Sequence, residues 1–221
     1  MMRWTRVVVV VAAVLVAVLA AGGMCRAGDR FGVAAKAGTL GIGVELTAQL
    51  NPWFGLRGSV NGFDYKHEFK REDINYDGDF RFGASGVFAD FYPLRGRFRL
   101  SAAALGNRNK IDMTAAPTAN VQIGDNTYTP GQVGVLNGEM KFHSAVTYFG
   151  IGYGNAARGP GRIGFVLDAG VMPQGEPTVT LTSSTGLVGA ADLQKETAKL
   201  KDDLHHARVW PVIALGISIR L

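Results

Sequence analysis

The chain has 221 residues, 30 of them glycine, with 10% aromatic and only 19% charged residues. A soluble domain averages roughly 25% charged residues, so this composition favours a membrane β-barrel over a soluble globular fold. The single cysteine, Cys25, excludes an internal disulfide framework, and the lack of a basic run or an aromatic-interleaved patch argues against a nucleic-acid partner. The length suits one domain of ordinary size.

Residues 1–27 have the pattern of a secretory signal peptide. Arg3 and Arg6 precede an uncharged run over residues 7–21, and small residues follow. This run is shorter than the roughly 20 apolar residues that a spanning helix needs, which favours a cleaved signal over an inner-membrane anchor. We therefore expect a signal peptide over residues 1–27 and a mature barrel domain over residues 28–221.

The cleavage is expected after Ala27, with Gly22 or Gly23 as the alternative site. A lipoprotein signal at Cys25 is disfavoured, because Met24 is large where a small residue is required. Removing the signal takes away three arginines and no acids, so the mature net charge is 20 minus 18, or +2.

Apolar and polar residues alternate through most of the remaining chain, which predicts strands rather than helices. Turn residues such as Asn51-Pro52 separate the alternating segments. The predicted strands cover residues 39–50, 54–66, 76–92, 98–109, 143–154, 163–172, 178–182 and 209–221. The stretch from Phe31 could lengthen the first of them.

The second predicted strand contains an irregularity. Its apolar positions shift parity at Phe63 and Tyr65, which suggests a β-bulge there. Residues 66–73 follow as a predicted charged loop.

Two later segments depart from the strand pattern. Residues 110–139 are polar and contain glycine, with a small hairpin expected at 121–123 and 127–129. In residues 192–208 the period changes, because Leu193, Leu200 and Leu204 lie at helical spacing. We predict a helix there, in a loop before the last strand.

Residues 209–221 show the barrel pattern most clearly. One set of alternate residues, from Ile213 to Leu221, is apolar and branched, while the other set is small or polar and includes Arg220. We interpret the small, polar face as the inner wall of a narrow barrel and the branched face as lipid-facing. At the end of the third strand, Asp90, Phe91 and Tyr92 would lie where an aromatic girdle meets the headgroups.

The predicted fold is therefore all-β, a transmembrane antiparallel up-and-down β-barrel of about eight strands with a short helix in one loop. This count has one difficulty, because residues 110–139 then fall at the barrel end where short turns are normal. A missed strand or a reversed assignment would remove the difficulty.

The polar faces of the predicted strands supply seven candidate lumen-lining charges. They are Glu45, Arg57, Asp79, Arg81, Arg99, Asp168 and Arg220. An eight-stranded barrel is just wide enough for its side chains to fill it, so opposite charges would pair and close the interior. In the alternative, a narrow path with both signs of charge would suit an amino acid, which also carries both signs.

No catalytic constellation, metal site or cofactor is expected. The four histidines lie in or near loops or strand ends, and His205 and His206 are adjacent, which places them on different sides of a helix. The alternating glycines of residues 150–154 resemble a phosphate-binding loop, but no helix pattern follows them. We therefore do not expect an enzyme.

The order and spacing of six segments, together with the predicted helix before the last strand, carry a resemblance to a known family. The segments are AGTLGIGVEL (37–46), NPWFGLRGSVNG (51–62), GDNTYTPGQVGVLNGEMKF (124–142), YFGIGYG (148–154), DAGVMPQGEPTVTL (168–181) and WPVIALGISIRL (210–221). In these segments the chain resembles the CarO-type outer-membrane proteins, also called ornithine uptake porins.

The resemblance implies an eight-stranded barrel in a Gram-negative outer membrane. It also implies two candidate activities, uptake of small basic amino acids and entry of carbapenem antibiotics. The expected partners are outer-membrane lipid, the barrel-assembly machinery through the C-terminal strand, and a small solute. The two functional hypotheses are thus a narrow channel and a closed barrel whose exposed loops bind a partner.

Overall fold

The computed structural model describes residues 30–71, 74–158, 161–204 and 208–221. The predicted signal peptide over residues 1–27 and the pair His205 and His206 lie outside these ranges. Within the described parts of the chain, no helix is both long and apolar enough to cross a membrane.

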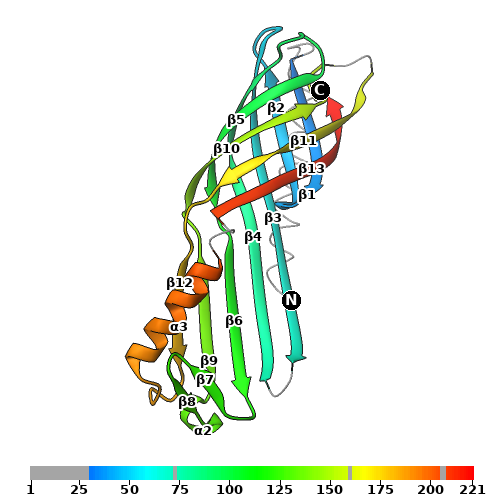
Figure 1. The fold of residues 1–221 in the computed structure, drawn as a ribbon. Coiled ribbons are helices and arrows are strands. Elements are labelled where there is room, and N and C mark those ends of the chain that lie inside the picture. Colours follow the sequence, from blue (N-terminus) through cyan, green and yellow to red (C-terminus); the bar gives the residue numbers. More distant parts are fainter. Residues whose placement is uncertain (1–29, 72–73, 159–160, 205–207) are drawn as a thin grey trace.

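Eight antiparallel strands close into a ring (Figure 1). Their order around the ring is β1-β2-β3-β4-β5-β10-β11-β13, and β13 pairs with β1 to close it. The bounds are β1 (Phe31–Gly38), β2 (Gly41–Gln49), β3 (Phe54–Arg71), β4 (Ile74–Phe91), β5 (Phe98–Asn107), β10 (Ala145–Tyr153), β11 (Ile163–Pro173) and β13 (Val209–Arg220). The predicted fold class, an up-and-down antiparallel barrel, is confirmed.

Among the described residues, one end of the ring carries short connections between neighbouring strands, and it is called the short-turn end below. The turns at residues 50–53 and 92–97, the connection after β10, and Leu221 lie there. Several strands continue beyond the opposite end of the ring as a second sheet, seen below the ring in Figure 1.

This extension sheet consists of the outer parts of β3 and β4 together with β6 (Lys110–Pro117), β9 (Leu136–Lys141) and β12 (Thr178–Ser183). β3 and β4 each have 18 residues. At about 3.3 Å per residue, each therefore spans on the order of 60 Å, which is more than a membrane crossing needs.

The extension sheet continues the hydrogen-bond register of the ring. β4 pairs with β5 at Ala84↔Asn107 and with β6 at Arg81↔Lys110, so the register passes from β5 to β6 without a slip. The pairing of β5 with β10 passes in the same way into the pairing of β6 with β9. The two sheets are therefore one structure that is closed at one end and open at the other.

The two faces of the long strands exchange polarity where the strands leave the ring. Within the ring, β4 turns Phe88 inward and Val87 outward, so the apolar Val87 meets the surroundings. Beyond the ring, the face continuous with the interior carries Phe82, and the outer face carries Arg81. An outer face that is apolar around the ring and charged along the extension fits lipid around the first and water around the second.

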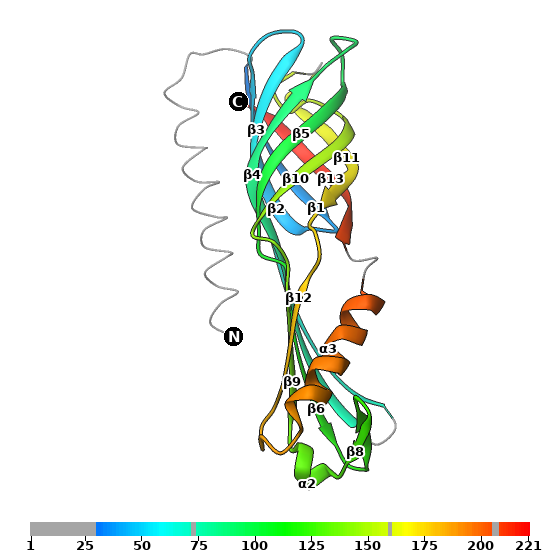
Figure 2. The same cartoon turned by 60° about the vertical axis from the view of Figure 1, so that its left-hand side comes forward.

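One helix and a small hairpin cover the inner, apolar face of the extension sheet. α3 (Ala190–Asp203) runs along the sheet, and α2 (Pro130–Val133), β7 (Val121–Ile123) and β8 (Asn126–Tyr128) lie at its tip (Figure 2). Ile123, Val133 and Val188 form a buried cluster with Leu136 and Leu193. The predicted hairpin is confirmed, and the predicted helix begins two residues earlier and ends five residues earlier than expected.

The first predicted strand is in fact two strands. β1 and β2 form a hairpin whose turn lies at Thr39 and Leu40, and Gly41 follows with φ of +94°. Alternation is present on both sides of the turn, but the inward positions change there from even residues in β1 to odd residues in β2, a shift that the sequence analysis did not interpret as a turn. This missed strand moves residues 110–139 to the extension end and removes the difficulty in the sequence-based count.

Three other details differ from the prediction. Residues 66–71, expected in a charged loop, belong to β3, and the short strand at 178–182 belongs to the extension sheet rather than the ring. The register of β3 with β4 runs unbroken from Phe54↔Phe91 to Arg71↔Ile74, so there is no bulge at Phe63. The parity shift there instead marks the exchange of polarity at the edge of the ring.

Candidate functional site

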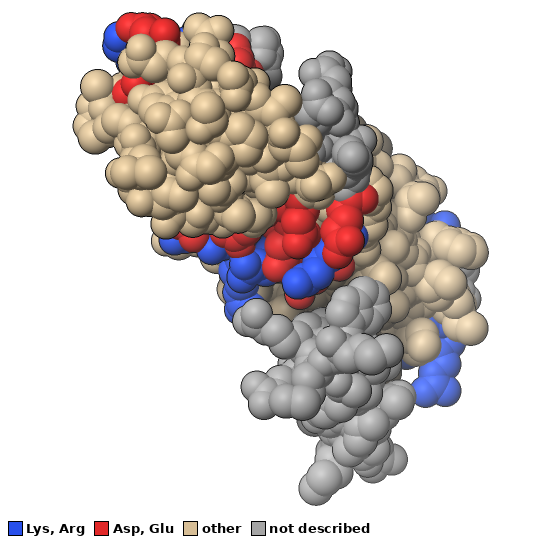
Figure 3. All heavy atoms as spheres, turned by 90° about the horizontal axis from the view of Figure 1, so that it is seen from below, with Lys and Arg blue, Asp and Glu red and all other residues tan. Residues whose placement is uncertain are grey.

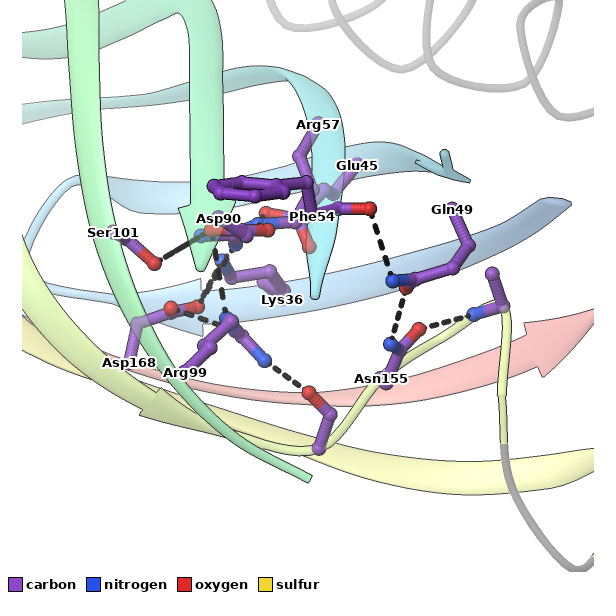
Figure 4. A network of polar contacts seen from close by, with 12 residues as sticks. Lys36, Glu45, Gln49, Phe54, Arg57, Asp90, Arg99, Ser101, Asn155 and Asp168 are labelled. Carbon is purple, nitrogen blue, oxygen red and sulfur yellow. Dashed lines mark hydrogen bonds and ion pairs between the residues drawn. The ribbon is translucent and has the colours of Figure 1, made fainter. Parts of the chain in front are cut away.

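Six of the eight ring strands each place one charged side chain inside the ring. They are Lys36 (β1), Glu45 (β2), Arg57 (β3), Asp90 (β4), Arg99 (β5) and Asp168 (β11). None is more than 8% exposed. Three cations face three carboxylates, and Figure 4 shows them converging from opposite walls. These six residues are called the charge network below.

Arg57 lies at the centre of the charge network. Its Nε and Nη2 donate to the two carboxylate oxygens of Asp90 at 2.5 and 2.9 Å, and its Nη1 donates to Glu45 Oε2 at 2.6 Å. Ser101 Oγ accepts from Nη2 at 3.1 Å, and the guanidinium lies 4.7 Å from the ring centre of Phe88. The rigid fork of arginine is suited to joining two carboxylates in this way.

Lys36 and Arg99 connect the rest of the network. Lys36 Nζ lies 2.9 Å from Glu45 Oε2 and 2.5 Å from Asp168 Oδ2. Arg99 Nη2 donates to Asp168 Oδ1 at 2.7 Å, and its Nη1 donates to the carbonyl of Gly154. Every carboxylate therefore contacts at least one cation, which offsets the several kcal/mol that each unpaired buried ion would cost.

A buried apolar layer lies between the charge network and the extension end. Leu40, from the turn after β1, packs there with Leu105, Val146, Met172 and Val212. Phe88 and Tyr148 belong to the same cluster and meet edge to face, with ring centroids 5.3 Å apart. The interior thus has a charged layer and an apolar layer stacked along the barrel.

Some buried polar atoms around the network have no hydrogen-bond partner among the described residues. They include Glu45 Oε1, Thr47 Oγ1 and the hydroxyl of Tyr148. Such atoms mark places where the polar interior could accommodate a further polar group.

Four of the seven sequence-predicted residues meet in the charge network: Glu45, Arg57, Arg99 and Asp168. Asp79 and Arg81 lie elsewhere, on the charged outer face of the extension sheet, where Arg81 pairs with Asp112. Both residues are on β4, whose odd-numbered side chains face outward. They also lie in the part of β4 that precedes the ring, which β4 joins at Ala84. Arg220 is at the short-turn end, opposite Gly32 of β1.

Sequence reasoning missed Lys36 and Asp90. Lys36 lies in the strand that was merged with its neighbour, and Asp90 was assigned to the aromatic girdle at the strand end. The alternation contained a signal for each, because Lys36 shares parity with the small residues Gly32 and Ala34, and Asp90 shares parity with the small residues Ala84 and Gly86.

The extension contains a second candidate site, a pocket of about 320 Å³ between the apolar sheet face and α3. Ile111, Met113, Met140 and Leu181 line it from the sheet, and Leu200 lines it from the helix. Its size and apolar walls are those of a small-ligand site. Among the described residues, no three His, Cys, Asp or Glu side chains are placed to hold a metal ion.

Asp192, in the first turn of α3, accepts hydrogen bonds from the β7–β8 hairpin beside this pocket. Its Oδ2 accepts from Asn126 Nδ2 at 2.8 Å and from the Tyr128 hydroxyl at 2.6 Å, and its Oδ1 accepts from the backbone N–H of Asp125 at 3.2 Å. The hydrogen bonds from Asn126 and then Tyr128 lower the pKa of the Asp192 carboxyl, because they favour its ionised form.

Solved structures of similar fold identify the architecture. No protein-family model matches the sequence, and no curated protein sequence is significantly similar to it. The crystal structure of Acinetobacter baumannii CarO2 superimposes with a TM-score of 0.60 at 22% sequence identity, covering 87% of this chain and 98% of that one. A. baumannii CarO gives a TM-score of 0.59 at 24% identity with the same coverage of both chains.

The fold is CarO-like. The resemblance expected from the six sequence segments is therefore matched in three dimensions at the level of the fold. At these identities the likeness to CarO concerns the fold, so the activity has to be argued from the charge network and the extension.

Proposed function

We propose that the chain is an outer-membrane protein whose barrel is closed and whose extension, on the outer side of the membrane, binds other molecules. The exchange of polarity along the long strands supports this placement. Around the ring the outward side chains are apolar, whereas along the extension they pair charges such as Lys110 with Glu139. Only the ring has the outer surface that lipid requires.

The observation that carries the closed state is the pairing of all six interior charges. A solute that crossed the barrel would have to separate ion pairs such as Arg57–Asp90, and several kcal/mol per exposed ion opposes that step. It would then have to pass the apolar layer around Leu105 and Met172, which offers no ionised partner to a charged solute. The two layers therefore oppose permeation independently.

The extension has the features of a ligand-binding region. Its pocket has apolar walls on two sides, and its outer face carries acidic and basic side chains together. Seen from the extension end, charges of both signs gather in one band, with wide uncharged areas beside it (Figure 3). We propose that the pocket takes an apolar group and that the charged band limits non-specific association.

A narrow channel for small basic amino acids is the second candidate. The unpartnered Glu45 Oε1, Thr47 Oγ1 and Tyr148 hydroxyl favour it, because an entering ammonium or water could bond to them. The channel requires the apolar layer to open, whereas the closed barrel does not.

Liposome swelling and planar-bilayer recording with ornithine separate the two candidates. The closed barrel predicts no ornithine-driven swelling and no steady conductance. The double variant Leu105→Ala, Met172→Ala serves as the comparison, since it removes two side chains from the apolar layer without touching the charge network. If the unmodified protein admits ornithine well above empty liposomes, the closed barrel is wrong and the channel stands.

The binding role of the extension is tested separately in lipid nanodiscs with an amphiphilic fluorescent probe. The probe also enters the lipid without saturating, and this uptake is the same for all variants. The saturable binding of the probe is therefore the quantity that is compared among the variants. Met113→Trp should fill the pocket and remove saturable binding, whereas Leu187→Trp, at an exposed position outside the pocket, should leave it unchanged. Saturable binding that survives Met113→Trp would place the binding elsewhere.

A further inference from the structure

The short-turn end of the barrel carries a cluster of exposed arginines. Arg95 and Arg97 lie in the turn after β4, and Arg158 and Arg162 lie in the connection between β10 and β11. Arg30 precedes β1, and the half-buried Arg220 ends β13 opposite Gly32 at the same end. In the described parts of the chain, the carboxylates nearest this end are the C-terminal one and those of the buried charge network. A surface of one sign at one end of a barrel attracts an anionic partner.

Three of these arginines surround one hollow. Arg97, Arg158 and Arg162 line a depression of about 40 Å³, together with Asn155 and Ser218. Its size suits a single small polar group rather than a whole metabolite. A phosphate group matches it chemically, because each guanidinium can donate two parallel hydrogen bonds to phosphate oxygens.

The hollow also touches the lipid-facing wall. Ile163 and Phe165 of β11 line it as well, and they are 70% and 78% exposed on the outer side of the ring. A bound group would therefore have an anionic head among the arginines and an apolar part on Ile163 and Phe165. Free phosphate has no apolar part that would contact Ile163 and Phe165.

The level of the arginines along the barrel agrees with a membrane border. The Arg95 guanidinium lies 4.3 Å from the ring centre of Trp53, and Trp53 stacks on Phe91 with ring centroids 6.2 Å apart. Aromatic side chains gather at the depth of lipid headgroups, where the surroundings change from apolar to wet. Arg97, in the same turn as Arg95, is thus placed at headgroup depth.

From this geometry we propose that the short-turn end binds the phosphate of an anionic phospholipid, with Arg97, Arg158 and Arg162 on the headgroup and Ile163 and Phe165 on an acyl chain. The bound lipid holds this end against the phospholipid leaflet, so that the extension projects from the opposite side. This inference does not depend on whether the barrel is closed.

Native mass spectrometry of the detergent-solubilised protein tests the proposal, with phosphatidylglycerol, phosphatidylcholine and inorganic phosphate titrated in parallel. Retention of phosphatidylglycerol is expected to exceed that of phosphatidylcholine. The triple variant Arg97→Gln, Arg158→Gln, Arg162→Gln should weaken phosphatidylglycerol binding about tenfold or more, since each cation near a membrane surface contributes measurably to binding. Phe165→Ser should weaken lipid binding while leaving any phosphate binding unchanged.

The matched control removes the same charge from the extension, as Lys66→Gln, Lys141→Gln, Lys195→Gln, all at exposed positions. Heat-dependent gel migration verifies that each variant is folded. The proposal is overturned if the arginine variant retains phosphatidylglycerol like the parent or if the control loses it equally. It is also overturned if inorganic phosphate displaces the lipid at equal concentration, which would make the hollow a free-phosphate site.

Discussion

Lys36 Nζ lies 2.5 Å from Asp168 Oδ2, and this contact joins β1 to β11 through the interior although β13 separates them in the ring. The two residues are 132 positions apart, so the contact exists only once the ring has closed. Lys36 also contacts Glu45, which makes this one amino group the counter-ion of two carboxylates.

Removing the Lys36 charge should therefore destabilise the barrel strongly. Lys36→Met leaves Glu45 and Asp168 buried with less positive charge between them, and the expected loss is about 3–5 kcal/mol in the free energy of unfolding. Urea unfolding in detergent micelles measures it. The control is Lys66→Met, whose amino group is 3.7 Å from Asp79 but largely exposed, and which should cost no more than about 1 kcal/mol. Equal effects of the two variants would show that the network is not what holds the ring.

The inner wall beside the network should not tolerate a methyl group. A Cβ built on Gly152 would lie 2.7 Å from the Cζ of Arg99 and 2.9 Å from Asp168 Oδ1. We expect Gly152→Ala to cost about 1–3 kcal/mol in the free energy of unfolding, because Arg99 must shift away from Asp168. Gly58→Ala is the control, since a Cβ there meets no atom within 4 Å. The same unfolding assay would contradict the packing described above if both variants behaved alike.

The exchange of polarity predicts opposite tolerance of charge on the two parts of the outer face. Ile217→Lys introduces a cation at an outward position of the ring, and we expect a loss of about 2–4 kcal/mol, since the side chain would face hydrocarbon. Thr180→Lys lies on the outer face of the extension sheet and should change stability by less than about 0.5 kcal/mol. Unfolding from lipid vesicles measures both. A similar loss of unfolding free energy in the two variants would contradict the placement of the ring in the membrane.

Acidification should release the hairpin from α3. The folded-state pKa of Asp192 is lowered by the hydrogen bonds from Asn126 and Tyr128, so the ionised carboxylate contributes stability above the unfolded-state pKa. That contribution is lost as the pH falls below about 4 toward the lowered folded-state pKa.

Hydrogen exchange over residues 121–133 follows this release as a function of pH. Faster exchange of the hairpin is expected at low pH in the parent protein, whereas Asp192→Asn should exchange faster already at neutral pH and respond less to acid. The control is Asp203→Asn, at an exposed position near the end of the same helix. An unchanged pH response in Asp192→Asn would assign the release to another group.

Local alternation was enough to determine the C-terminal strand and its two faces. The pattern of residues 209–221 predicted β13, and the branched side chains Ile213, Leu215 and Ile217 are indeed on the exposed face. The helical spacing of Leu193 and Leu200 likewise predicted α3. These features depend on residues two to seven positions apart, and a single segment contains all the information they need.

The tertiary structure decided which strands pair and which charged residues lie inside the ring. The turn at Thr39 shifts the outward apolar positions from odd residues such as Val33 to even residues such as Ile42, but this short shift alone did not show that β1 pairs with β13 and β2 with β3. Asp79 and Asp90 lie on one strand, but only Asp90 contacts Arg57, because the two residues lie on opposite faces of β4 and β4 pairs within the ring only from Ala84 onward. The point at which β4 joins the ring is set by the partners of β4, which change from β5 to β6, and those partners lie too far along the chain for local periodicity to specify.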